Sequence, residues 1–98
     1  MTTLPTIHQN GTGARTLMGE YSAVAFAAKA AFYALSSSTC DQRDFYPQGE
    51  AAWKAAQAER QKALRMLNAV ILYAEDWQLH ATENEFRAMD AKRGKEGD

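Results

Sequence analysis

Apolar residues recur every three or four positions along most of this 98-residue chain, which is the period of an α-helix that packs on one face. The first stripe consists of Leu17, Tyr21, Val24, Ala28, Ala31 and Leu35. The second consists of Trp53, Ala56, Arg60, Ala63, Leu67, Val70, Ala74, Trp77 and Ala81, with Arg60 its one polar member. The pattern predicts helices at about 14–38 and about 47–92, joined by the loop 40–49.

The two ends of the chain lack this period. Residues 1–13 contain one proline and two glycines, so we expect an extended arm that ends in a turn, with Asn10 or Thr12 capping the first helix. Residues 93–98 are expected to form a disordered tail. The chain is thus predicted to be all-α, an antiparallel helical hairpin over 14–92 with an extended N-terminal arm and a long second helix.

Two features of this hairpin predict a homo-oligomer. The first helix carries a second apolar set off its main stripe: Met18, Phe26, Ala30 and Tyr33. One partner helix cannot cover both faces. The second helix, about 60 Å long against about 35–40 Å for the first, leaves its last third without an intrachain partner. That third carries Trp77, Leu79, Phe86 and Met89. The alternative is a break near residues 75–76 and a third helix that folds back.

Charge and composition narrow the class of partner. The net charge of −1 gives no general attraction to nucleic acid or to an anionic membrane. No run approaches the roughly 18 apolar residues of a membrane span. The single cysteine, Cys40, cannot form an internal disulfide and suits a reducing cytosol. The N-terminus lacks the basic and apolar regions of a signal peptide, so we expect a cytoplasmic protein.

The arm is the first candidate ligand site. Glycines before a helix free backbone N–H groups to face an anion, and the helix dipole and Arg15 would add positive charge. His8, Asn10 and Thr12 could supply directional hydrogen bonds. The alternative is an ordinary helix start behind a mobile arm.

The loop is the second candidate. Arg43 and Asp44 lie beside Phe45 and Tyr46, a combination that could hold a phosphate and stack a base. The alternative is a structural turn in which the two aromatic residues close the end of the core and Arg43 pairs with Asp44. The two candidates should lie at opposite ends of one hairpin, so they can share a pocket only between neighbouring copies.

No catalytic or metal-binding pattern is present in the sequence. His8, Cys40 and His80 are scattered, without the close spacing that metal ligands need. A nucleophile beside a base and an orienting group is also missing. We therefore expect a protein without a metal or other cofactor and without enzymatic activity.

The arm Leu4–Thr12 and the loop Arg43–Gly49 resemble segments of small uncharacterised proteins of phages and prophages, with an Ile-His-x-Asn-Gly-Thr arm and an Arg-Asp-aromatic-Tyr-Pro-Gln-Gly loop. The resemblance covers about residues 4–80 and implies a phage or prophage origin, and no activity. In size and layout the chain is also similar to phage anti-defence sponges, short helical hairpins that oligomerise and trap nucleotide signals between subunits.

These observations lead to one functional expectation and one alternative. The expected function is a non-catalytic, oligomeric phage-type protein of the host cytoplasm that sequesters a small anionic, nucleotide-like ligand in anti-defence. Its ligand would contact His8, Asn10, Thr12 and Arg15 of the arm and Arg43, Asp44 and Tyr46 of the loop. The alternative is a protein-interaction module that binds a host or virion protein through the second helix.

Overall fold

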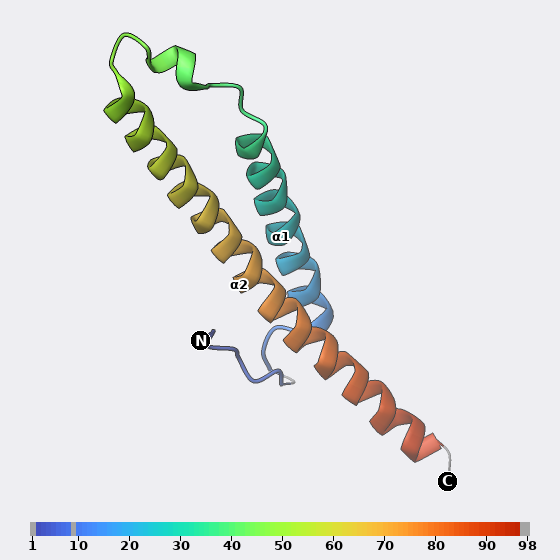
Figure 1. Ribbon diagram of the computed structural model, residues 1–98. Coiled ribbons are helices and arrows are strands. Elements are labelled where there is room, and N and C mark those ends of the chain that lie inside the picture. Colours follow the sequence, from blue (N-terminus) through green and yellow to red (C-terminus); the bar gives the residue numbers. More distant parts are fainter. Residues whose placement is uncertain (1, 9, 97–98) are drawn as a thin grey trace.

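The computed structural model describes residues 2–8 and 10–96, with side chains through residue 88. Two α-helices, α1 (Ala14–Ser36) and α2 (Glu50–Glu96), lie side by side and antiparallel, and the short 3-10 helix η1 (Gln42–Phe45) forms part of the loop between them (Figure 1). The described residues contain no strand. The predicted all-α hairpin with an extended arm is therefore confirmed. Its outline is a rod of 76 × 22 × 19 Å.

Helix α2 is one continuous element of 47 residues. It passes through residues 75–76 unbroken, so the alternative with a third helix is wrong. It begins at Glu50, after Gly49, whose positive φ of 97° turns the chain into the helix. The expectation of an unstructured tail is wrong for residues 93–96, which continue the helix. Lys, Arg and Glu favour helix there, and one interior glycine costs only about 1 kcal/mol. The last two residues, 97–98, lie outside the described ones.

The two ends of α1 differ slightly from the prediction. Its N-cap is Gly13, which makes no side-chain cap, so the expected capping by Asn10 or Thr12 is wrong. The expected turn does form, because the Gly11 N–H donates to the His8 carbonyl over 3.1 Å. The chain then needs two more residues to enter the helix. At the other end α1 stops at Ser36, whose hydroxyl bonds the Phe32 carbonyl of its own helix.

The contact between the helices is built from small residues. The buried apolar side chains are Leu17, Ala25, Ala28, Ile71, Ala74 and Ala81. Four of the six are alanines, which let two helices approach closely, because interaxial distance depends on side-chain size at the contact. The aromatic contribution comes from Tyr21, whose ring stacks on Trp77 with centroids 4.5 Å apart.

The loop sets which parts of the helices pair. Phe45 packs against Trp53, with ring centroids 5.6 Å apart, so the loop and not α1 covers the first turns of α2. Helix α1 is thereby paired with a later stretch of α2, from Arg60 beside Ser36 to Glu85 beside Arg15.

This register corrects the predicted overhang. Trp77 belongs to the hairpin contact, and the stretch beyond α1 begins only after Glu85. Phe86, at 62% exposure, lies there, whereas Leu79, at 60%, faces outward within the paired region. The side chain of Met89 lies outside the described ones.

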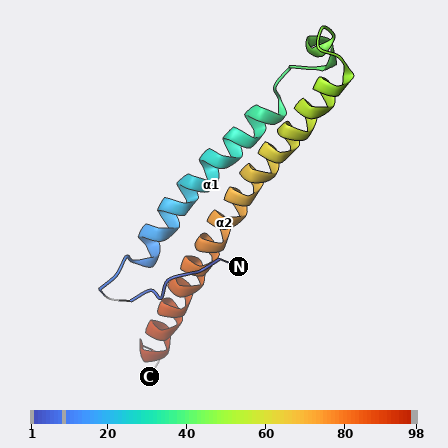
Figure 2. The ribbon, with the colours of Figure 1, turned by 90° about the vertical axis from the view of Figure 1, so that its left-hand side faces the viewer.

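The arm also covers part of α2. The Thr2 hydroxyl donates to the Asp76 carboxylate over 2.6 Å, and His80 Nε2 lies 2.6 Å from the Pro5 carbonyl oxygen. Figures 1 and 2 show the arm running back from the start of α1 along α2. The arm is therefore fixed to the hairpin at two points and is not a free extension.

Candidate functional site

A pocket of about 350 Å³ lies beneath the arm. Its walls come from the arm, from the start of α1 and from α2: Pro5, Thr6, Ile7, His8, Gly11, Thr12, Leu17, Tyr21 and Trp77. It contains two of the predicted ligand residues, His8 and Thr12. Trp77 carries a buried indole N–H without a hydrogen-bond partner in the structure. Buried polar groups are normally paired, but this nitrogen has almost no accessible surface, so it is closed to a ligand in the pocket as the structure stands.

The imidazole of His8 lies close over Gly11. A Cβ atom added to Gly11 would stand 2.9 Å from His8 Nε2, too close for an ordinary contact. The Gly11 N–H is already used by the turn, so it is not free to face an anion. The Gly11 N–H therefore serves the turn and not the anion cradle that the sequence indicated. The close contact is with the end of the exposed His8 side chain, which can move, so it does not by itself require glycine here.

The other two arm residues stand outside this pocket. Asn10 is exposed, and the Arg15 side chain is 85% exposed. Arg15 Nε donates to Glu85 Oε1 over 2.9 Å, so a carboxylate already offsets its charge. An anionic ligand would have to compete with Glu85 for Arg15.

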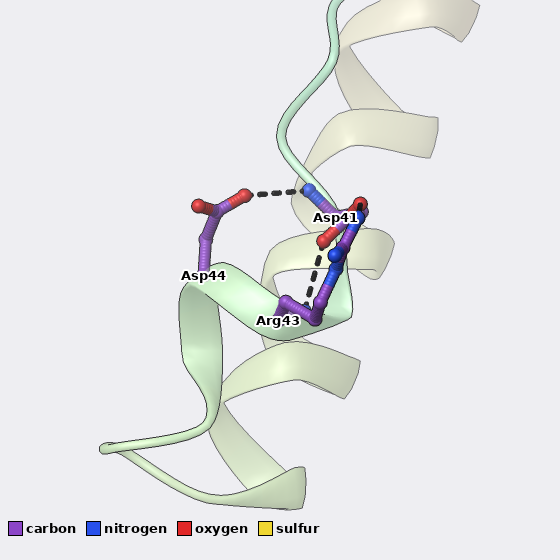
Figure 3. A network of polar contacts seen from close by, with 3 residues as sticks. All are labelled: Asp41, Arg43 and Asp44. Carbon is purple, nitrogen blue, oxygen red and sulfur yellow. Dashed lines mark hydrogen bonds and ion pairs between the residues drawn. The ribbon is translucent and has the colours of Figure 1, made fainter.

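The polar residues of the loop mainly stabilise η1. The Asp41 carboxylate accepts from the Arg43 N–H and the Asp44 carboxylate accepts from the Asp41 N–H, each over 2.9 Å, which makes a capping box (Figure 3). Phe45 packs inward on Trp53. The interpretation of the loop as a structural turn therefore accounts for the positions of the Asp44 and Phe45 side chains. The expected ion pair between Arg43 and Asp44 is wrong, because Arg43 pairs with Asp41.

Arg43 and Tyr46 are left open to a ligand. The Arg43 side chain is 80% exposed, and its guanidinium lies 3.7 Å from Asp41, a loose pair. Tyr46 is 67% exposed and does not close the core. Of the predicted loop residues, these two keep the freedom that stacking and phosphate binding require.

A second pocket, of about 470 Å³, lies between the end of α1, the loop and the start of α2. Leu35, Phe45, Trp53 and Leu64 form its apolar walls, and Cys40 and Arg60 add polar groups. Sequence reasoning missed this pocket because Trp53 and Leu64 fit a core stripe. Arg60, the polar member of that stripe, was the available signal.

The single thiol at this pocket is not activated. Desolvation, followed by a hydrogen bond to Asp44 and the charges of Asp44 and Asp41, raises the pKa of Cys40 above its ordinary value, while Arg60 acts in the opposite direction. A raised pKa keeps the thiol protonated at neutral pH, and the thiolate is the nucleophilic form.

The arm and loop clusters stand at opposite ends of α1, as the hairpin topology predicted (Figure 1). At about 1.5 Å per residue, the 23 residues of α1 separate them by about 35 Å. One copy of the chain therefore cannot bring Arg43 and Tyr46 to the same small ligand as His8 and Thr12.

The outer surface of the hairpin is unusually apolar. Eleven large apolar side chains are between 37% and 78% exposed: Leu4, Val24, Phe26, Tyr33, Tyr46, Met66, Val70, Leu72, Tyr73, Leu79 and Phe86. Several of them lie on each helix, and a contiguous group of such side chains would mark an interaction site. The described helices include none that is long and apolar enough to cross a membrane.

Within the described part of the chain, no three His, Cys, Asp or Glu residues gather as metal ligands would. The chain matches none of the protein-family models, curated proteins or solved structures with which it was compared.

Proposed function

We propose that this chain is a non-catalytic binding protein whose working form is an assembly of identical hairpins. The observation that carries the proposal is surface area. The chain exposes 7636 Å², whereas a compact monomer of its mass would expose about 5,600 Å². The difference, about 2,000 Å², exceeds the roughly 800 Å² that each partner buries in a standard interface.

The ligand that we propose for this assembly is small, anionic and nucleotide-like, held between copies and sequestered in phage anti-defence in the host cytoplasm. Arg43 and Tyr46 would supply charge and stacking from one copy. His8, Asn10, Thr12 and Arg15 would contribute from another copy. The pocket beneath the arm, which His8 and Thr12 line, supports the arm as one part of this site.

The assembly is tested by light scattering after size exclusion, at 10–200 micromolar, about the range in which protein interfaces of moderate affinity form. We expect a mass of at least two chains. A single-chain mass throughout would contradict the assembly and, with it, a ligand held between copies.

The ligand is tested by calorimetry against nucleotides, including cyclic dinucleotides. We expect binding that Arg43→Ala abolishes and that Arg65→Ala, a matched change at an exposed position on α2, leaves intact. Absence of heat at millimolar nucleotide with an intact assembly would end the ligand proposal and leave the assembly standing.

A protein partner on α2 is the second candidate function. Leu72, Leu79 and Phe86 are spaced by seven residues on one side of α2 and are 55%, 60% and 62% exposed. Such a row fits a partner helix. The double variant Leu79→Glu, Phe86→Glu should then lose one defined host or virion partner in pull-down and keep its oligomeric mass. Loss of the oligomer instead would assign this row to self-assembly.

A further inference from the structure

We propose that two copies pair antiparallel through the outer face of α1, about a twofold axis at Phe26, so that the arm of each copy lies at the same end as the loop of the other. This inference rests on the proposed assembly and names the interface through which two copies would associate.

The outer face of α1 is an uninterrupted apolar stripe. Its members are Gly19, Ala23, Phe26, Ala30 and Tyr33, spaced by four, three, four and three residues. All five are exposed, Phe26 at 78% and Tyr33 at 66%. Ala25 and Ala28, which are buried, lie on the opposite side of α1, toward α2. The stripe therefore repeats the spacing of a helix seam. Of its members, Tyr33 also lines a pocket with residues of α2, namely Asn68 and Ile71.

This stripe is self-complementary when reversed. Gly19 and Tyr33 each stand seven residues from Phe26, one on either side. Antiparallel pairing about Phe26 places the ring of Tyr33 from each copy over Gly19 of the other. A Cβ atom at Gly19 would meet nothing within 4 Å, so the space for that ring is open. A twofold interface requires a surface that is complementary to itself. Binding to an unrelated partner would not require this property.

Charges on α1 are compatible with this pairing. Besides Arg15, the helix carries only Glu20 and Lys29, and both fall on the flanks of the stripe. Antiparallel pairing also sets the positive N-terminal end of each α1 beside the negative C-terminal end of the other, which is the favourable arrangement of helix dipoles.

The same pairing sets the two predicted clusters at the same end of the dimer. Arg15 and Ser37 both stand eleven residues from Phe26, so Arg15 of one copy is level with Ser37 of the other. The arm of one copy and the loop of the other consequently lie at the same end of the dimer, while each arm still turns back over its own α2. A parallel pairing would instead place arm beside arm and loop beside loop.

Disulfide trapping tests the orientation, in a Cys40→Ser background. Chains with Gly19→Cys are mixed with chains with Tyr33→Cys and oxidised mildly. We expect a cross-linked heterodimer, because a disulfide needs Cα atoms within about 7 Å. Gly19→Cys alone should not cross-link to itself, since the two positions would be about 21 Å apart. Self-linking of Gly19→Cys would show a parallel pair and overturn the inference.

Charge insertion tests the same face without cysteines. Gly19→Arg has open space in the hairpin and should keep its helix content by circular dichroism while its mass falls to one chain. Ala58→Arg, an exposed change on α2, should keep the wild-type mass. If wild type is oligomeric but Gly19→Arg remains so, this interface is wrong and the proposed assembly uses another face. If wild type is a monomer, both proposals fail.

Discussion

Arg60 shows how one polar residue in an apolar stripe can serve the fold. Its guanidinium donates from one nitrogen to the carbonyl of Leu35, over 3.0 Å, and to that of Ser36, over 2.8 Å. These are carbonyls at the end of α1, which have no acceptor role within their own helix. A cation there also complements the negative end of the helix dipole. Arg60 thus caps α1 from the neighbouring helix.

Replacing this cap should destabilise the hairpin. For Arg60→Ala we expect a loss of about 1.5–3 kcal/mol in the free energy of unfolding, because two hydrogen bonds from a charged donor disappear. The Leu35 carbonyl keeps the N–H and hydroxyl of Ser38 as donors, so the loss falls mainly on the Ser36 carbonyl. Urea unfolding at fixed protein concentration measures it. Arg65→Ala is the matched control. Equal effects of the two changes would contradict the capping role of Arg60.

The raised pKa of Cys40 gives a second prediction at this scale. Alkylation by iodoacetamide should be slow at pH 7 and should rise with pH to a midpoint above that of an ordinary thiol. Asp44→Asn removes a negative charge and leaves only a weaker, neutral hydrogen-bond acceptor for the thiol, so it should lower the pKa of Cys40 and speed alkylation at pH 8. Glu83→Gln, near the other end of α2, should not. An unchanged rate in Asp44→Asn would argue against the proposed cause.

At the scale of elements, the apolar periodicity of the sequence was sufficient to predict the two helices and their antiparallel order. It could not give the register, because that depends on how many turns of α2 the loop covers. Phe45 against Trp53 settles this, and no local pattern in the sequence indicates that contact. The same shift explains why Trp77, predicted in an overhang, packs on Tyr21.

The candidate site was less predictable than the fold. The clustering of polar residues in the arm pointed to His8 and Thr12, which do line a pocket. It did not point to Tyr21 and Trp77 on the other side of that pocket. Those two belong to helix stripes, where aromatic residues are expected in a core. Only the return of the arm over α2 brings them to the pocket, through contacts such as His80 with Pro5 that join residues far apart in the chain.

The contact between His80 and the arm gives a testable prediction. His80→Ala removes the contact to the Pro5 carbonyl, so the arm should leave α2 more often and expose Trp77. Acrylamide quenching in a Trp53→Phe background should increase. Thr82→Ala, whose hydroxyl bonds only the Gln78 carbonyl of its own helix, is the control. Identical quenching in both variants would mean that other contacts hold the arm.

The whole molecule is far from globular. Its radius of gyration is 20.9 Å, against about 12.6 Å for a compact chain of this length. No described side chain of large volume is fully buried. A hairpin with so little core would gain stability by burying more apolar surface, and the assembly of identical copies that we propose would supply that burial.

Stability should therefore depend on protein concentration. For a dimer, a tenfold increase adds about 1.4 kcal/mol, which corresponds to a rise of about 3–5 °C in Tm. Differential scanning calorimetry from 5 to 500 micromolar covers about two such steps. Phe26→Asp should flatten the dependence. A wild-type Tm that does not change over this range would exclude coupled folding and assembly.

The alanine contact between the helices has a mechanical consequence. Alanine has no side-chain rotamers, so if α1 slid along α2 by one turn, about 5.4 Å, the main buried side chain to repack in the middle of the hairpin would be Ile71. Such a slide would pull Arg60 away from the carbonyls of α1 and separate the rings of Tyr21 and Trp77. The register between α1 and α2 thus depends largely on contacts toward the two ends of the hairpin. A ligand that altered either contact would alter how firmly that register is held.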